Sequence, residues 1–160
     1  MNFQIRPVNP EEATALSKLA FAAKAYWGYP ERWMEIWRPQ LTFSPQYFEE
    51  NESWVAETDG LPAAFCTLQE KEGNAWLEDL WVAPEFIGQG LGKRLFLHAA
   101  EKSHQRGYRT LRLEADPHAL GFYEKMGMHK IGERYYEIEG QPRILPIIEL
   151  PLPLDKGSGN

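Results

Sequence analysis

A glycine-rich stretch is the feature of this sequence most suited to binding a charged ligand. Gly88, Gly90 and Gly92 fall within five positions, between an apolar run and the start of an apolar helical pattern. The N-terminus of a helix has unpaired N–H groups and the positive end of the helix dipole, and glycines let an anion approach the main chain closely. Lys93 and Arg94 follow directly and add cationic side chains. This stretch predicts a site for an anion with several phosphates.

Two known phosphate-binding patterns fit this stretch poorly. A Walker loop would need glycine where Ile87 stands and Ser or Thr where Arg94 stands. A dinucleotide-binding fingerprint would need its third glycine at Lys93, although Glu114, about twenty residues on, is the acidic residue that such a fingerprint expects. The remaining alternative is a turn that only reverses the chain between a strand and a helix.

Composition limits the class of protein. The chain has 160 residues, 43% of them hydrophobic, which suits one domain, here predicted over residues 1–154, with 155–160 as a disordered tail. The net charge of -6 argues against a nucleic-acid partner and favours a cationic or neutral small molecule. No signal peptide or membrane span is recognised, so a cytoplasmic protein, monomeric or homodimeric and without a membrane partner, is expected.

The cysteine and histidine residues give no sign of a metal site. Cys66 lies in the apolar run AAFCTL, where a buried side chain is expected and no disulfide partner exists. The four histidines show no compact ligand spacing with cysteine or carboxylates, so no metal is expected.

The pattern of apolar residues, glycines and prolines predicts alternating strands and helices. Two helices are expected between the first and second strands. The last strand contains Pro146 and is expected to be an edge or bulged strand. The expected strands are 3–8, 53–58, 61–69, 73–84, 110–115, 128–133 and 143–152, and the expected helices are 11–26, 30–37, 92–107 and 117–126.

Two motifs in this order resemble those of the Gcn5-related N-acetyltransferase (GNAT) family. They read V-x-P-E-x-x-G-x-G-x-G-K-R-L from Val82 to Leu95 and A-x-x-F-Y-E-K-x-G from Ala119 to Gly127. The resemblance implies an α/β (α+β) domain with a mixed, mostly antiparallel sheet flanked by helices. It also implies acetyl-CoA as co-substrate, with its pyrophosphate on the glycine-rich loop.

The same resemblance implies a set of residues that bind acetyl-CoA. These are Leu80, Trp81, Val82, Ile87, Gly88, Gln89, Gly90, Leu91, Gly92, Lys93, Asp116, Ala119, Phe122 and Tyr123. Two of them depart from the family pattern. Ile87 stands where the family usually has Gln or Arg, and Asp116 stands where it often has an Asn that binds the pantetheine arm. An ionised Asp accepts hydrogen bonds but cannot donate them.

Acetyl transfer to an amine needs a proton acceptor, donors for the oxyanion and an acid for the departing thiolate. The resemblance implies a main-chain N–H near Leu80 or Val82 at the thioester carbonyl and the Tyr123 hydroxyl at the leaving sulfur. Glu78 is the favoured base and Asp79 the reserve, and the two should lie on opposite faces of their strand. The alternatives are that both carboxylates are solvated or bind a cationic substrate, and that Tyr123 belongs to the core.

Aromatic residues cluster where the family's first two helices usually line the acceptor site. Trp27, Tyr29, Trp33 and Trp37 could hold an apolar group or an ammonium, or could pack in the core. Arg143, in the turn between the last two strands, could bind a carboxylate on the acceptor.

The sequence therefore predicts an acyl-CoA-dependent N-acetyltransferase. Its acceptor would be a primary amine of a small molecule or peptide, which attacks acetyl-CoA directly in a ternary complex. The alternative function is a non-catalytic module that binds or senses acyl-CoA, and a nucleotide-binding Rossmann domain is a more distant one.

Overall fold

The structure is a computed structural model that describes residues 2–154 of the chain. Contacts divide it into two units. One comprises the chain up to Leu68 together with Asp79–Leu97, and the other comprises Gln69–Glu78 together with the chain from His98 on. The predicted tail at 155–160 lies outside the described residues, and a single domain over 1–154 stays a prediction.

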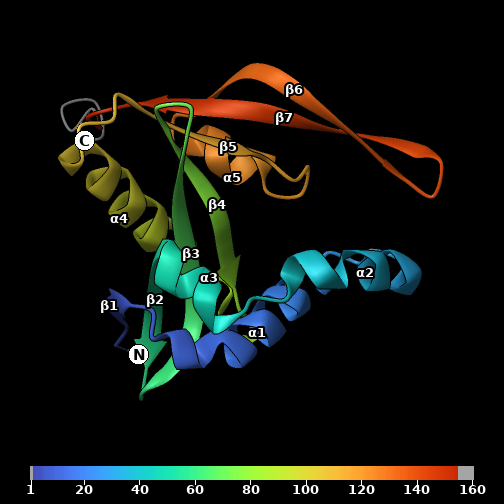
Figure 1. The fold of residues 1–160 in the computed structure, drawn as a ribbon, viewed down its shortest axis with the longest axis horizontal. Helices are drawn as coiled ribbons and strands as arrows, with labels where there is room; N and C mark the ends of the chain where they lie inside the picture. The colour runs from blue at the N-terminus through green and yellow to red at the C-terminus, as the bar shows by residue number, and fades with distance from the viewer. Residues whose placement is uncertain (1, 155–160) are drawn as a thin grey trace. The chain divides into compact units, whose positions relative to one another are not determined.

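The first unit begins with a strand and a helix that follow the predicted pattern (Figure 1). Asn9 caps the 3-10 helix η1 (Pro10–Glu12) through a capping box, and α1 (Ala13–Ala25) continues from it. The apolar stripe of α1 is buried as expected, with Leu16 and Ala20 fully inaccessible. Apolar residues at this spacing lie on one helix face, which is why the stripe could be predicted.

One helix of the first unit was missing from the sequence prediction. Besides α2 (Glu31–Trp37) and η2 (Arg38–Leu41), a third helix, α3 (Pro45–Glu50), precedes the second strand. Ser44 caps α3 by accepting a hydrogen bond from the N–H of Tyr47 at 3.2 Å. A Ser-Pro pair is a helix-start signal, but six residues are too few to show helical periodicity.

The strands follow one another along the chain as predicted. In the sheet, hydrogen-bonded neighbours lie in the order β1-β2-β3-β4-β5-β7-β6. β4 pairs with β5 in parallel, whereas the β1–β2, β2–β3, β5–β7 and β6–β7 pairs are antiparallel. This mostly antiparallel sheet with flanking helices confirms the predicted fold class. The strands are β1 (Gln4–Pro7), β2 (Glu52–Thr58), β3 (Leu61–Lys71), β4 (Asn74–Val82), β5 (Thr110–Glu114), β6 (His129–Ile138) and β7 (Gln141–Pro151).

The last two strands correct two expectations. β6 extends to Ile138, well beyond the predicted end at 133, and forms a long hairpin with β7 (Figure 1). β7 is not an edge strand, because β5 and β6 pair with it on either side. Pro146 is accommodated where β5 has ended, and its carbonyl accepts the N–H of Ala115 at 2.9 Å. The irregularity in pairing lies in β6, between Lys130 and Gly132.

Two helices follow the glycine-rich loop and β5. α4 (Leu91–Gln105) contributes residues to both units, and α5 (Leu120–Lys125) belongs to the second. Each helix ends two residues before the glycine that was predicted to close it, Gly107 or Gly127, and these glycines have φ of 87° and 98°. Glycine takes such left-handed conformations without the steric cost that a Cβ adds. α5 is shorter than the predicted 117–126 helix.

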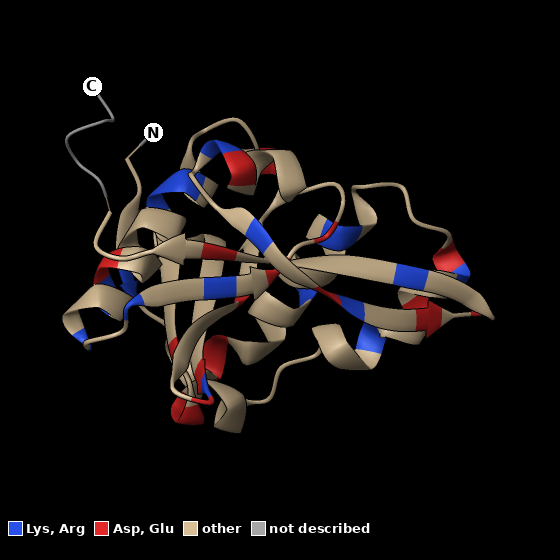
Figure 2. Ribbon diagram, turned by 90° about the horizontal axis from the view of Figure 1, so that it is seen from above, with Lys and Arg blue, Asp and Glu red and all other residues tan. Residues whose placement is uncertain are grey.

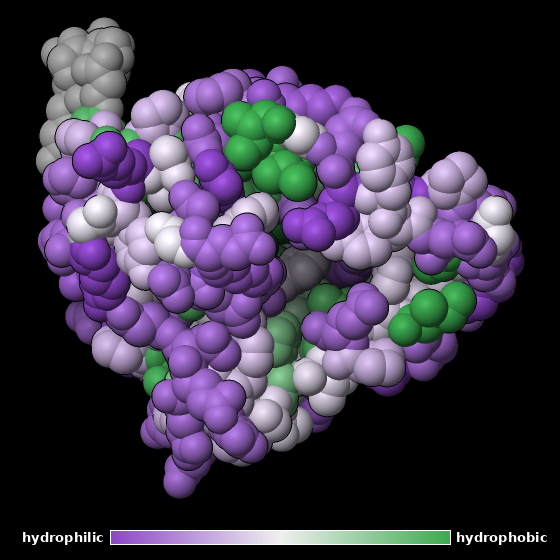
Figure 3. All heavy atoms as spheres, turned by 45° about the horizontal axis from the view of Figure 1, so that its top comes forward, coloured by the Kyte–Doolittle hydropathy of each residue, from purple (hydrophilic) through white to green (hydrophobic). Residues whose placement is uncertain are grey.

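The surface is mixed in charge and in hydropathy. Basic and acidic positions are interspersed over the ribbon in Figure 2, and hydrophobic groups on the face drawn in Figure 3 are separated by hydrophilic atoms. Within residues 2–154, no helix is both long and apolar enough to cross a membrane.

Candidate functional site

The glycine-rich loop has the backbone conformation that its sequence predicts. Gly88 and Gly90 have φ of 89° and 78°, and a Cβ added at either would meet no atom within 4 Å. The loop follows the short helix η3 (Pro84–Phe86), and α4 starts at Leu91. The glycines therefore supply left-handed turns and leave open space beside the main chain at the start of a 15-residue helix.

The main-chain N–H groups of this loop are available to a ligand. The Ile87 N–H donates to the carbonyl of Pro84, and the Arg94 N–H donates to the carbonyl of Gly90 at 3.1 Å. Between them, residues 88–93 donate no main-chain hydrogen bond to any acceptor in the described part of the chain. Consecutive free N–H groups at a helix N-terminus favour an anion.

The side chains around the loop add limited polarity. Lys93 is exposed and forms no ion pair with residues 2–154, whereas the Arg94 guanidinium donates to the carbonyl of Phe3 at 3.1 Å. Ile87, which replaces the usual polar residue, is 49% exposed. The groups of the loop without a partner in residues 2–154 are therefore main-chain N–H groups and the Lys93 side chain.

The two candidate bases lie in β4 and differ sharply in burial. Asp79 is 9% exposed, whereas Glu78 is exposed, as expected for neighbours on opposite faces of a strand. In the second unit, the Glu78 carboxylate is ion-paired with Lys71, whose ammonium also lies 5.3 Å from the ring centroid of Trp76. Glu78 is thus open to solvent and already has a cationic partner.

Asp79, in the first unit, is held by a residue that sequence reasoning did not identify. The Tyr47 hydroxyl, from α3, donates to Asp79 Oδ2 at 2.6 Å. Tyr47 and Asp79 are 32 positions apart, so no local pattern could have paired them. Burial raises the pKa of the neighbouring Cys66 thiol to about 12, and the Asp79 charge adds to this shift. Cys66 is fully buried and protonated, which agrees with its predicted packing role.

The remaining predicted residues of β4 are the last three of the strand and come shortly before the glycine-rich loop. Leu80, Trp81 and Val82 are each partly buried. The indole Nε1 of Trp81 is buried and has no hydrogen-bond partner among residues 2–154, and its ring lies 5.9 Å from that of Trp27. The strand end is fixed by the Ala83 N–H, which donates to the carbonyl of Ala63 at 2.9 Å.

The aromatic residues of α2 and of the segment between α1 and α2 form a cluster that already contains a cation. The Tyr29 ring lies 4.9 Å from that of Trp37, and the Trp33 ring lies 5.9 Å from Trp37. The Lys24 ammonium lies 3.9 Å from the centroid of Trp37. One ring face that was expected to bind a substrate ammonium is therefore occupied by a lysine of the chain itself.

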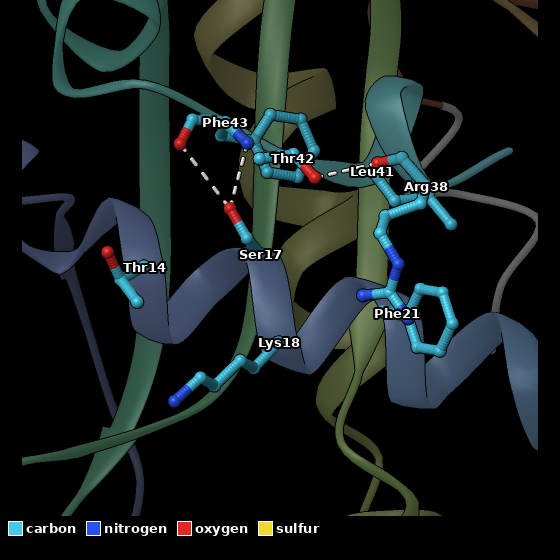
Figure 4. Close-up of a pocket in the computed structure, with 8 residues that line it drawn as sticks. All are labelled: Thr14, Ser17, Lys18, Phe21, Arg38, Leu41, Thr42 and Phe43. Atoms are coloured by element: carbon cyan, nitrogen blue, oxygen red, sulfur yellow. Dashed lines mark hydrogen bonds between the residues drawn. The ribbon is translucent and has the colours of Figure 1, made fainter. Parts of the chain in front are cut away.

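Two grooves lie beside these helices in the first unit. One, of about 350 Å³, runs between α1 and η2, where the Arg38 guanidinium lies 4.1 Å from the Phe21 ring and Ser17 binds the main chain of Phe43 (Figure 4). None of the predicted site residues lines it. The other, of about 680 Å³, is lined in part by Tyr29, Met34 and Glu35.

In the second unit, Tyr123 lies on α5 and is 8% exposed. Its ring centroid is 5.1 Å from that of Phe122, and its carbonyl accepts the N–H of Met128 at 3.2 Å. Ala119 immediately precedes α5, and its carbonyl accepts the N–H of Tyr123 at 3.2 Å. Tyr123 is thus fixed by packing and by the backbone of a short helix.

The structure joins two residues that the sequence suggested for separate roles. Arg143 Nη2 donates to Asp116 Oδ2 at 2.7 Å, and both side chains are largely buried. A second pair lies in the same unit, where the Tyr136 hydroxyl donates to a carboxylate oxygen of Glu114. Burial and then this hydrogen bond raise the pKa of Tyr136 to about 12. Tyr136 and Glu114 were not predicted as site residues, because they are 22 positions apart on different strands.

Comparison with known proteins defines the class of this fold. The structure resembles a PaiA N-acetyltransferase from Thermoplasma acidophilum solved in complex with coenzyme A, with a TM-score of 0.74 and 21% sequence identity. The match covers 94% of this chain and 99% of the other. The fold is therefore that of the N-acetyltransferases.

Sequence comparison gives the family. Residues 19–128 match the Acetyltransferase (GNAT) family, and the chain belongs to it. It is 33% identical over 96 residues to a putative [ribosomal protein bS18]-alanine N-acetyltransferase of Bacillus subtilis, covering 57% of this chain and 64% of that protein. It is also 33% identical over 108 residues to the peptidyl-lysine N-acetyltransferase YjaB of Salmonella typhimurium, covering 67% and 69%. Family and relatives support an acyl-CoA-dependent N-acetyltransferase.

Proposed function

We propose that this protein transfers the acetyl group of acetyl-CoA to a primary amine of a peptide or small molecule. The observation that carries the proposal is the row of free main-chain N–H groups at residues 88–93, at the N-terminus of α4. These groups would bind the pyrophosphate of acetyl-CoA, since main-chain donors at a helix N-terminus favour phosphate. The remaining predicted acetyl-CoA contacts, including Asp116 and Phe122, are part of the proposal.

A peptide amine is the acceptor that the relatives favour. One relative, from Escherichia coli, is named a [ribosomal protein bS18]-alanine N-acetyltransferase and another a peptidyl-lysine N-acetyltransferase. Both acceptors are amines of a polypeptide and carry positive charge at neutral pH. The aromatic residues Trp27, Tyr29 and Trp33 would line the acceptor site beside α1 and α2, with Lys24 limiting the cationic groups that Trp37 can accept.

The proposed chemistry is direct attack within a ternary complex. The amine nitrogen forms a bond to the thioester carbonyl carbon and loses a proton to the base, for which Glu78 is proposed and Asp79 is the reserve. A main-chain N–H near Leu80 or Val82 would stabilise the oxyanion. The carbon–sulfur bond then breaks, and the thiolate of CoA takes a proton from the Tyr123 hydroxyl. No covalent enzyme intermediate is required, which agrees with the burial of the only cysteine.

A panel of amines tests the proposal. The protein is incubated with acetyl-CoA and, in turn, an alanine-initiated peptide, a lysine-containing peptide with a blocked N-terminus, and a small diamine. Release of CoA and the mass of the acetylated product are both measured. We expect turnover with at least one peptide. Binding of CoA without turnover of any amine would instead favour the non-catalytic sensing module.

The proposal also covers the domain organisation, assembly and cellular compartment of the enzyme. Residues 1–154 would act as one catalytic domain without a metal, as a monomer or homodimer in the cytoplasm, where acetyl-CoA is available. Light scattering measures the assembly, and cell fractionation measures the compartment. Activity after treatment with a metal chelator tests the need for a metal.

A further inference from the structure

The ammonium of Lys24, in the last turn of α1, lies on the aromatic cluster formed by Tyr29, Trp33 and Trp37. It is 3.9 Å from the centroid of the Trp37 ring and 5.8 Å from that of Tyr29. Trp37 is buried, whereas Lys24, Tyr29 and Trp33 are only partly buried. The structure therefore shows a primary alkylammonium bound to these rings, at a place that solvent reaches in part.

Tyr29 connects this cluster to the groove of about 680 Å³ in the first unit, which it lines in part. The charged residues that line the groove are Glu31, Arg32 and Glu35. Glu35 is ion-paired with Arg38 at 2.8 Å, so positive and negative charges around the groove nearly balance. The lining by itself therefore gives no strong preference for the charge of a ligand.

We propose that Lys24 sets the charge preference of the acceptor site. Its ammonium occupies ring faces that would otherwise bind a positive charge of the acceptor, so the enzyme favours an amine without a second cationic group beside it. This inference rests on the proposed function, in which Tyr29 and Trp33 line the acceptor site. Like charges repel, and a ring face that holds one ammonium is closed to another. The reacting amine attacks in its neutral form, so Lys24 acts mainly against a second charge.

Pairs of acceptors that differ by one charge test this role. The reactive peptide of the amine panel is made with either glutamine or arginine next to the acetylated residue, and 4-aminobutan-1-ol is compared with 1,4-diaminobutane. We expect the parent protein to have the higher kcat/KM for the neutral member of each pair that it turns over. Lys24→Met, which keeps a long apolar side chain, should raise kcat/KM for the charged member by about tenfold. The value for the neutral member should stay within about twofold of the parent.

Two lysine variants provide matched controls. Lys24→Arg keeps a cation that binds aromatic rings, so it should keep the preference of the parent. Lys18 is an exposed lysine of the same helix, and Lys18→Met removes the same charge from α1. This variant should also keep the preference of the parent. Lys24→Gln is a second neutral variant and should behave as Lys24→Met does.

Tetramethylammonium gives a second readout, because it is a cation that cannot be acetylated. It should inhibit Lys24→Met competitively with the acceptor, since the ring faces are then open to it. Inhibition of the parent and of Lys18→Met should be weaker by about tenfold.

A purely structural role of Lys24 gives a different result. Lys24→Met and Lys24→Gln would then have a lower Tm but the acceptor preference of the parent, and tetramethylammonium would inhibit all the proteins equally. This result would overturn the inference. The same change of preference in Lys18→Met would also overturn it, because the effect would then follow the net charge alone. A parent protein that turns over no amine would instead refute the proposed function, and the inference with it, before any variant is made.

Discussion

Substitution of Gly90 by valine distinguishes two roles of the loop. Either the loop binds CoA, or it needs glycine only for its backbone conformation. Gly90 has φ of 78°, and a Cβ built on it meets no atom within 4 Å. The valine side chain therefore enters open space and strains only the backbone. Left-handed backbone costs a non-glycine residue roughly 1–2 kcal/mol. For a chain of this length, such a loss corresponds to a fall in Tm of about 2–8 °C.

The expected loss in CoA affinity is larger than this strain. The new side chain would lie where phosphate is proposed to approach the N–H groups of residues 88–93. A hydrogen bond to a charged group contributes about 1.5–3 kcal/mol, so loss of two such bonds weakens binding by about 10²-fold or more. Isothermal titration with CoA measures the affinity, and thermal unfolding measures the stability.

Gly60 offers a matched control in the turn between β2 and β3. It has φ of 76° and no atom within 4 Å of an added Cβ, so Gly60→Val suffers almost the same strain. We expect both variants to lose similar stability, and only Gly90→Val to lose CoA affinity. Equal CoA affinity in the two folded variants would show that the loop is a turn without a role in binding.

Three further predictions concern the proposed chemistry and the stability of the first unit. Tyr123→Phe keeps the packing of a buried ring but removes its hydroxyl, so kcat should fall by roughly 10²-fold with a smaller change in KM; full kcat with a lower Tm would assign Tyr123 to the core. Glu78→Gln should lower kcat/KM at neutral pH by about 10²- to 10⁴-fold, with partial recovery at high pH as free amine accumulates, and Asp79→Asn is the parallel test; pH–rate profiles that both overlay the parent would exclude both carboxylates. The pKa of Glu12 lies below its ordinary value of 4.5, chiefly because of the hydrogen bond from the Arg6 guanidinium. The ionised carboxylate therefore stabilises the folded chain above pH 4.5, and this stability is lost as the pH falls through the folded pKa. Glu12→Gln should lower the free energy of unfolding by about 1 kcal/mol at pH 7, and its stability in urea unfolding should depend less on acid pH. An unchanged pH dependence would contradict the assignment.

The parts of the fold that the sequence predicted are set by local rules. The left-handed glycines that end α4 and α5, and the Asp59–Gly60 turn between β2 and β3, depend on the backbone freedom of one or two residues. The buried stripe of α1 follows from helical spacing alone. Family motifs also predicted the fold class and the enzyme class, because the glycine-rich loop and the segment around Tyr123 are each continuous in sequence.

The parts that the sequence did not predict depend on contacts between distant positions. The length of β6 and the inner place of β7 arise from pairing between strands, and a Pro146 that looks incompatible with an inner strand is tolerated because β5 ends beside it. The short helix α3 shows too few turns for periodicity, yet it supplies the tyrosine that binds Asp79.

The candidate site divides in the same way. The sequence by itself determined the left-handed loop before α4, because this backbone conformation depends on the single residues Gly88 and Gly90. Only the tertiary structure decided that Glu78 is exposed beside Lys71, that Asp79 is buried against Tyr47, and that Arg143 binds Asp116. The physical reason is that a charged side chain has no fixed role until folding sets its burial and its partner, and those partners lie between 7 and 32 positions away in the chain.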